Sequence, residues 1–599
     1  MTIELAPMDQ PRPASSSTTR CDPNDVALKS FFLGPQSENA DWLEEVLRGV
    51  LTAYFSWRRR THSGDGRAIS SEDQLNPVFQ RRRREFVAEV QRLLSRFESE
   101  VPKFSPRYIA HMFSETSMPA IVGHVITLLH NPNNISGESS RVGVNIEEEA
   151  IQALATMLGF DTSQVRGHFT SGGTVANFEA MVRARKRMQR WLAVGARARE
   201  VGDGGQSLFE AAHMGWEDHD ELKKAVSEPA APLEPLPHNP FDMAARLEAI
   251  FDAPYRGPVI LVPDHKHYSW VKGAELLGIG GEAFWSIELD NQGLLKVDHL
   301  RQRIDEARDQ NRPIMMVVSV TGTTEMGAFD PVDEVQNLLD RLRQQQNLHI
   351  YHHVDAAYGG FFAASVCANG DACEMDPGVC RSLQAIRRVN SVTLDPHKLG
   401  YVPYSSGAFL SANAREYFAS AVDAPYLDFE PERDRGPQTI EGSRSAAGAV
   451  ATWLTARTIG LDADGYGRIL QRTVQARKRL QRSLLELNIP VRVAPSTSNI
   501  LTFCVAHEGE PLSATNARTH ALYQFFSPQR DSPFFVSRTT LRFSAYQAML
   551  EPFIESWDAV QDADELMMIR LCIMNPFIDS RETDVDFIAE FARALDAAV

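Results

Sequence analysis

Short apolar runs that alternate with helical patterns constrain the fold of this chain more than any other feature of its sequence. They lie between about residues 257 and 410 and read PVILVP, AFWSIEL, IMMVVSV, LHIYHHV, SVTLD and SGAFL. Runs that are apolar on both faces are typical of strands in a parallel sheet covered by helices on both sides. The sequence therefore predicts an α/β fold with a mostly parallel sheet.

The rest of the chain predicts further parts around this sheet. The first residues are rich in Pro, Ser and Thr, which is typical of a flexible tail, and apolar residues at helical spacing follow. After the sheet region, a long helix (Ala446 to Thr458) and strand-like runs indicate a smaller α+β domain. The expected parts are a tail over 1–25, an N-terminal helical segment over 26–135, a large domain over 136–440 with a polar, Pro-rich surface insertion at 201–242, and a small domain over 441–599.

Composition argues against several kinds of partner. The net charge of −17 disfavours binding to a nucleic-acid backbone, which needs clustered Lys and Arg. No apolar run is long enough to cross a bilayer. The six cysteines are too few for a disulfide framework, and Cys367, Cys373 and Cys380 lack the CxxC spacing of a metal site. We expect a cytoplasmic protein with no nucleic-acid, membrane or metal partner and with these three cysteines in a loop.

Lys398 is the first of three chemical features at loop positions of the predicted sheet. It follows a short strand and comes directly after His397. A lysine amine held in a pocket can act as a nucleophile and form a Schiff base with a carbonyl group. A lone lysine is as often an ordinary surface residue, so the residues around Lys398 decide whether it is interpreted as a nucleophile.

Asp355 is the second feature and ends the strand-like run HIYHHVD. Burial of a carboxylate there requires a partner, and a pyridinium nitrogen is a suitable one. The third feature is Ser171-Gly172-Gly173 at the start of an amphipathic helix, where backbone amides can bind a phosphate group. The phosphate cradle, the aspartate and the lysine together predict a pyridoxal phosphate site.

The sequence resembles the group II pyridoxal-phosphate-dependent decarboxylases, and above all the bacterial tyrosine decarboxylase branch. The resemblance runs from about Ser105 to Pro576 through SPRYIAHM, NPNNIS, TSGGTVAN, PDHKHYSW, TGTTEMGAFDP, HVDAAYGG, DPHKLGYVPY, EGSRS and IRLCIMNP. The combination of HVDAAYGG with DPHK is highly specific for this group. The resemblance implies the transferase-like fold type I with a seven-stranded sheet in the large domain, and a homodimer with its sites at the subunit interface.

Residue roles follow from this resemblance. Lys398 matches the lysine that binds the cofactor, and Asp355 matches the partner of its ring nitrogen. His267 matches the imidazole stacked on the ring, with Ala357 beneath. Tyr426 matches a loop tyrosine that returns a proton to the α-carbon after carbon dioxide leaves. Further matches are Ser171, Gly172, Gly173, Thr324 and His397 for cofactor binding, and His111 (from the partner subunit), Tyr404 and Cys572 for the substrate pocket.

The implied activity is decarboxylation of an aromatic, tyrosine-like L-amino acid to the amine and carbon dioxide. Other readings stay open: a glutamate, aspartate or other L-amino acid substrate, or an aldehyde product. Cys572 stands where the tyrosine branch is expected to carry a serine, which puts the substrate in doubt more than the reaction. An acidic substrate would need a cation, and Arg107, Lys266 and Arg570 are candidates. A carbon–carbon lyase that acts on a phosphorylated amino alcohol is a further alternative, because such enzymes share the lysine, the aspartate and the stacked histidine. A non-catalytic protein of this fold would be expected to have lost Lys398, Asp355 or the phosphate loop, and all three are present.

Overall fold

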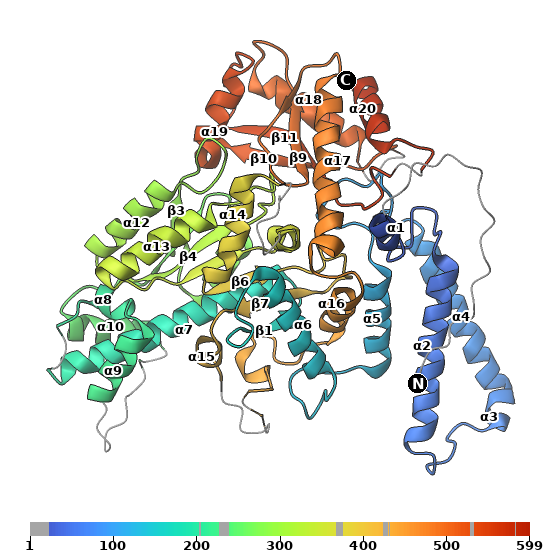
Figure 1. The fold of residues 1–599 in the computed structure, drawn as a ribbon, viewed down its shortest axis with the longest axis horizontal. Coiled ribbons are helices and arrows are strands. Elements are labelled where there is room, and N and C mark those ends of the chain that lie inside the picture. The colour runs from blue at the N-terminus through green and yellow to red at the C-terminus, as the bar shows by residue number, and fades with distance from the viewer. Residues whose placement is uncertain are drawn as a thin grey trace.

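The computed structural model describes residues 23–202, 205–226, 236, 239–366, 375–422, 429–430, 432–527, 532–580 and 583–599. The predicted tail lies almost entirely outside these residues, although helix α1 begins at Pro23. Tyr426 also lies outside them. Figure 1 shows a central sheet with helices on both faces, a second sheet toward the C-terminus, and a group of N-terminal helices at one edge.

The central sheet has seven strands in the order β1-β7-β6-β5-β4-β2-β3. Strands β2 to β6 pair in parallel. Strand β7 runs antiparallel to both β6 and β1, so β1 points the same way as the parallel strands. The prediction of a mostly parallel sheet is confirmed. The strands are β1 (Arg166–Thr170), β2 (Val259–Pro263), β3 (Phe284–Ile287), β4 (Ile314–Val320), β5 (His352–Asp355), β6 (Ser391–Leu394) and β7 (Gly407–Ser411).

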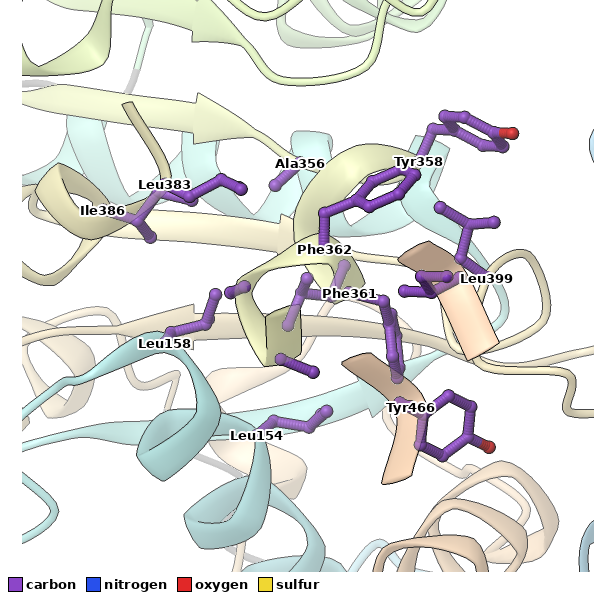
Figure 2. Close-up of a cluster of buried hydrophobic side chains, with 14 of the residues drawn as sticks. Leu154, Leu158, Ala356, Tyr358, Phe361, Phe362, Leu383, Ile386, Leu399 and Tyr466 are labelled. Carbon is purple, nitrogen blue, oxygen red and sulfur yellow. The ribbon is translucent and has the colours of Figure 1, made fainter. Parts of the chain in front are cut away.

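Both faces of this sheet are buried, as the doubly apolar strands require. In β2, Ile260 packs toward one apolar cluster and Leu261 toward another. Helices α7, α11, α12 and α13 contribute to these two clusters. A third cluster joins Leu154 of α6 and Leu383 of α14 to Phe361 in the turn after β5 (Figure 2). The helices are α6 (Gly143–Leu158), α7 (Gly173–Glu200), α11 (Ser269–Leu277), α12 (Val297–Asp309), α13 (Val332–Gln346) and α14 (Pro377–Ala385).

The stretch 201–242 is not simply a surface insertion. Its described part forms α8 (Leu208–Ala212) and α9 (Trp216–Val226), and α10 (Pro240–Phe251) begins at its end. Leu208 and Phe209 are buried, and α8 and α9 both pack against α7. The polar composition of this stretch gave no sign of α8, a short helix whose N-terminus is capped by the Ser207 side chain. The surface prediction is wrong for this part of the chain.

The N-terminal segment is helical, as predicted. It contains α2 (Ala40–Thr61), α3 (Ser71–Leu75), α4 (Pro77–Phe97) and α5 (Met118–His130). Helices α2, α3 and α4 lie at one edge of the molecule, away from the central sheet (Figure 1). Many of their large apolar side chains are exposed in the single chain: Leu51, Phe55, Trp57, Leu75, Val78, Phe86, Val87, Val90, Leu93, Leu94 and Phe97.

The C-terminal part contains a four-stranded antiparallel sheet in the order β10-β11-β9-β8. Its strands are β8 (Val491–Val493), β9 (Ile500–Val505), β10 (Ser537–Arg542) and β11 (Glu565–Cys572), with the helices α17 (Arg468–Leu485), α18 (Leu512–Phe525), α19 (Phe543–Glu555) and α20 (Phe587–Ala598). Helix α16 (Ala447–Thr458), which was expected to open the small domain, packs instead against α5 and α6. The division of the chain at residue 441 therefore separates α16 from the helices that it contacts.

None of the helices in the described ranges is both long and apolar enough to span a bilayer. Cys504 and Cys572 are free, buried and located in strands. Cys380 lies in α14 and is disulfide-bonded, which corrects the expectation of a loop cysteine. Cys367 and Cys373 lie outside the described residues. Among the described residues, no cluster of side chains could hold a metal ion.

Candidate active site

Loops at the carboxyl ends of β1, β2, β4, β5 and β6 surround a cavity of about 350 Å³. Open parallel sheets bind ligands at this edge because loops from several strands converge there. The structure brings many of the residues predicted from sequence into this one cavity. Those that line it are Ser171, Gly172, Gly173, His267, Thr324, Asp355, Ala357, His397, Lys398 and Tyr404.

Lys398 lies in a turn directly after β6. Its backbone N–H donates to the carbonyl oxygen of Asp395 at 2.9 Å. Its Nζ atom lies 3.0 Å from Oδ2 of the same aspartate, and its side chain is 19% exposed. His397 Nε2 lies 3.5 Å from that oxygen. Asp395, which the sequence analysis missed although it begins the DPHK motif, thus holds the lysine ammonium at the cavity.

Asp355 ends β5, and its carboxylate is almost fully buried. Oδ2 accepts hydrogen bonds from Asn177 Nδ2 at 2.8 Å and from Trp270 Nε1 at 3.2 Å. Oδ1 accepts one from the backbone N–H of Ala357 at 3.3 Å. Asn177 and Trp270 were also missed, although both lie in segments that carry the family resemblance. Two neutral donors therefore occupy one carboxylate oxygen and leave the other with a single backbone donor.

His267 lies in the loop between β2 and α11, and two donors meet its Nδ1 atom. The Ser269 hydroxyl is 2.9 Å away, and the Ser269 backbone N–H donates at 3.3 Å. Burial lowers the pKa of His267, Lys398 lowers it further, and the carboxylates of Asp355 and Asp395 act in the opposite direction. The lowered pKa makes the imidazole neutral at neutral pH.

The start of α7 forms a cradle of main chain. A Cβ atom on Gly173 would lie 2.7 Å from Asp395 Oδ2 and 3.1 Å from Ala357 Cβ. A Cβ atom on Gly407 would lie 2.5 Å from the backbone of Gly172. Side chains at these positions would fill the space beside the helix N-terminus, where backbone N–H groups favour an anion. In the structure the backbone N–H of Ser171 donates to Glu441 Oε2 at 3.2 Å.

The predicted substrate-pocket residues are placed differently from one another. Tyr404 lines the cavity, is 59% exposed, and stacks on His397 at 4.0 Å between ring centroids. His111 does not line it within the single chain, and its Nδ1 atom contacts Arg570 Nη2 at 3.2 Å. Cys572 is buried at the end of β11 and is also absent from the cavity wall. Of these three residues, Tyr404 lines the cavity of its own chain and Cys572 does not, whereas His111 was expected to line the cavity of the partner subunit.

Arg570 is a buried guanidinium close to the cavity. It donates to the carbonyl oxygen of Thr324 at 2.8 Å and to the Ser537 hydroxyl at 2.9 Å. Within the described part of the chain it has no carboxylate partner. Its position on β11 brings a cation from the C-terminal sheet into contact with Thr324, a residue of the cavity wall, without making Arg570 part of that wall.

These residues fit pyridoxal phosphate. The main-chain cradle at Gly172 and Gly173 suits a phosphate group, and the buried Asp355 suits a protonated ring nitrogen. The Lys398 amine enters the same cavity and can reach an aldehyde carbon there.

Comparisons with known proteins agree with this geometry. Residues 246–491 match the family described as pyridoxal-dependent decarboxylase conserved domain. The chain is 28% identical to an L-tyrosine decarboxylase of Levilactobacillus brevis, covering 96% of each chain. It is 27% identical to an L-tyrosine decarboxylase of Enterococcus faecium, covering 96% of this chain and 98% of the relative.

Solved structures support the fold. A structure of Oryza sativa TDC with PLP and tryptamine aligns with a TM-score of 0.60 at 16% identity, covering 97% of this chain and 98% of that one. At this identity the likeness concerns the fold alone, and it agrees with fold type I. The matches along the chain and the site at the carboxyl ends of the strands make this protein similar to the pyridoxal-phosphate-dependent amino acid decarboxylases, with L-tyrosine decarboxylases among the relatives that it resembles over nearly its whole length.

Proposed function

We propose that this enzyme converts an aromatic, tyrosine-like L-amino acid to its amine and carbon dioxide. One observation carries the substrate class: among the described residues of the cavity wall, Lys398 is the only lysine or arginine, and it is paired with Asp395. An acidic substrate side chain would need a cation of its own in the site. Met112, Val320 and Tyr404 add apolar and aromatic surface to the same wall.

The three cations that an acidic substrate could use support the same conclusion. Arg107 pairs with Glu590 at 2.6 Å, and Lys266 Nζ is 4.0 Å from Asp264. Arg570 lies behind Thr324, with its guanidinium engaged by a carbonyl oxygen, a hydroxyl and an imidazole. A glutamate or aspartate substrate remains the second candidate, and Arg570 is the residue that it would have to recruit.

The roles proposed here come from the family resemblance, and the presence of these residues at one cavity supports them. Bound pyridoxal phosphate supplies a protonated ring that accepts the electron pair released as the carboxylate leaves. Asp355 would hold the proton on the ring nitrogen, and Gly172 and Gly173 would bind the phosphate. Lys398 would supply the amine that anchors the cofactor. His267 would cover the ring and orient the substrate carboxylate.

Tyr426 is proposed as the general acid that returns a proton to the α-carbon. This role comes from the resemblance of DAPYLDFE to the mobile catalytic loop of the family. A positioned acid is required at this step because the α-carbon must gain one proton before the amine can leave.

A homodimer is proposed as the working form, and a cytoplasmic location is retained from the sequence. The support for a dimer is the apolar surface of α2 and α4, which includes Phe55, Phe86 and Phe97. Many exposed large apolar side chains on one group of helices are typical of a surface that another protein covers. A second copy of this chain is the expected occupant because His111 is expected to reach the partner's site.

Product analysis tests the proposed substrate. The purified protein, loaded with pyridoxal phosphate, is incubated with L-tyrosine, dopa, phenylalanine, tryptophan, glutamate and aspartate, and the products are identified by mass spectrometry. The aromatic members should give amine, and the Lys398→Ala variant, treated identically, should give none. Amine from the acidic members only would overturn the substrate class and leave the reaction intact. Aldehyde in place of amine would overturn the reaction.

A further inference from the structure

The groups assigned to the cofactor ring, Asp355 and His267, are joined by a chain of buried side chains. Asn177 lies between them on α7 and is 1% exposed. Its Nδ2 atom lies 2.8 Å from Asp355 Oδ2 and 3.0 Å from Ser269 Oγ. Ser269 Oγ lies 2.9 Å from His267 Nδ1. One amide group therefore connects the carboxylate to the imidazole through a single hydroxyl.

The direction of each hydrogen bond in this chain is fixed by chemistry. An ionised carboxylate only accepts, so the Asn177 amide must turn its nitrogen toward Asp355. An amide nitrogen has two protons, and the second one points to Ser269 Oγ. The hydroxyl accepts from Asn177 and keeps its own proton for His267 Nδ1.

A second contact gives the same direction independently. The backbone N–H of Ser269 can only donate, and it lies 3.3 Å from His267 Nδ1. A proton on Nδ1 would collide with this donor, so Nδ1 is the acceptor. The single proton of the neutral ring is then on Nε2.

The other end of Asn177 is also held. Its Oδ1 atom lies 3.4 Å from His353 Nε2, and His353 Nδ1 lies 2.8 Å from Ser391 Oγ. Burial lowers the pKa of His353 to about 3, so this imidazole is neutral and carries one proton. The Tyr351 hydroxyl donates to Ser391 Oγ at 2.8 Å, which leaves the serine proton for His353 Nδ1 and puts the imidazole proton on Nε2. Asn177 Oδ1 and, at 3.3 Å, the Thr393 hydroxyl both face that nitrogen. The amide is therefore oriented from both sides.

We propose that Asn177 and Ser269 are positioning residues that hold His267 as the Nε2–H tautomer and turn Asp355 so that Oδ1 faces the cofactor. The proposal rests on the assignment of His267 and Asp355 to the cofactor ring and adds what fixes them. His267 then acts as a hydrogen-bond donor through Nε2 and has no free nitrogen to accept a proton. A neutral imidazole would have to become an imidazolate to give up its Nε2 proton, so the proton for the α-carbon must come from another residue.

The first test reads the tautomer directly. Solid-state ¹⁵N spectra of histidine-labelled holoenzyme are recorded, with the His267 signals assigned by their loss in His267→Gln. We expect a protonated Nε2 and a bare Nδ1. A proton on Nδ1, or protons on both nitrogens, in the resting holoenzyme at neutral pH would overturn the proposal. This test does not depend on which amino acid is the substrate, so its failure is distinct from a failure of the proposed activity.

The second test measures cofactor binding and turnover in Asn177→Ala and Ser269→Ala. Loss of a buried hydrogen-bond partner is worth roughly a tenfold change in an equilibrium constant. Asn177→Ala should weaken pyridoxal phosphate binding by about tenfold, because Asp355 loses a donor. Ser269→Ala should change cofactor affinity by less than about threefold and lower kcat by about tenfold at an unchanged KM, because His267 loses its hydroxyl donor while the hydrogen bond from Asn177 to Asp355 stays.

Ser319→Ala is the matched control. Ser319 Oγ lies 2.9 Å from His352 Nε2, so the control also deletes a buried serine–imidazole contact in the same sheet. It should leave cofactor affinity and the kcat of the holoenzyme within about twofold of the parent. If Asn177→Ala and Ser269→Ala change these quantities no more than Ser319→Ala does, the proposal is wrong.

Discussion

Individual side chains in this site are held by neighbours that are distant in sequence. Asp355 ends β5, yet its carboxylate is bound by Asn177 from α7 and Trp270 from α11. Lys398 is the exception, since its partner Asp395 is three residues away. The local motif DPHK thus contains both members of an ion pair, whereas the environment of Asp355 is assembled only when the helices pack on the sheet.

Lys398→Ala should retain pyridoxal phosphate weakly and lose turnover. The amine both anchors the cofactor and releases the product, so the loss of kcat should be on the order of 10³-fold or more. The measurements are amine formation and the cofactor content after gel filtration. Lys296→Ala, an exposed lysine near Glu288, is the control and should match the parent. Turnover by Lys398→Ala at the parent rate would contradict the assigned role.

Tyr426→Phe should keep cofactor and substrate binding and slow amine formation. Loss of a positioned general acid lowers the rate by about 10²-fold or more, and we expect abortive products, aldehyde included, to take the place of amine. Products are quantified by mass spectrometry beside Tyr54→Phe, a tyrosine of α2 remote from the cavity. Amine formation as fast as in the parent would remove Tyr426 from the mechanism.

Among the elements, the strands of the central sheet were the most predictable. Strands β2 to β7 coincide with apolar runs in the sequence, because a strand buried on both faces has to be apolar throughout. Strand β1 was hidden within the phosphate motif, and its pairing with β7 is a contact between residues far apart in the chain. Helix α16 was predicted correctly as a helix but assigned to the wrong neighbours, because helical periodicity does not say which elements a helix packs against.

The packing of α16 on α5 gives a prediction for Gly123. A Cβ atom there would lie 2.8 Å from the Ala451 Cα atom, so the two helix backbones must move apart. Replacing a helical glycine with alanine gains about 1 kcal/mol in helix propensity, and overpacking costs about 1–3 kcal/mol. Gly123→Ala should therefore lower the free energy of unfolding by up to about 2 kcal/mol, measured by denaturant titration.

Gly281→Ala provides the matched comparison for Gly123→Ala. A Cβ atom at Gly281 would have no neighbour within 4 Å. This variant should leave the stability within about 0.5 kcal/mol of the parent. An increase in stability for Gly123→Ala would show that α5 and α16 are not as tightly packed as the structure has them.

At the scale of the whole molecule, the exposed apolar surface of α2 and α4 predicts a dimer. Charges introduced by Phe86→Glu and Val90→Glu on α4 should yield a monomer with a large loss of activity, because burial of a carboxylate in an interface is costly. Size-exclusion chromatography with light scattering measures the mass, and amine formation measures the activity. Leu276→Glu, at an exposed position of α11, should remain dimeric and active. A parent protein that is monomeric with full activity would contradict the dimer.

The sequence by itself determined the α/β class and the cofactor, and it named many of the residues that line the cavity, because these depend on local patterns: apolar runs, a glycine turn before a helix, and a lysine after a strand. Tertiary structure decided what lies around them. It placed Arg570 of the C-terminal sheet behind Thr324, left Cys572 outside the cavity wall, and inserted Asn177 between two groups of the site. Hydrogen-bond direction and burial depend on residues brought together only by folding, so no pattern along the chain records them.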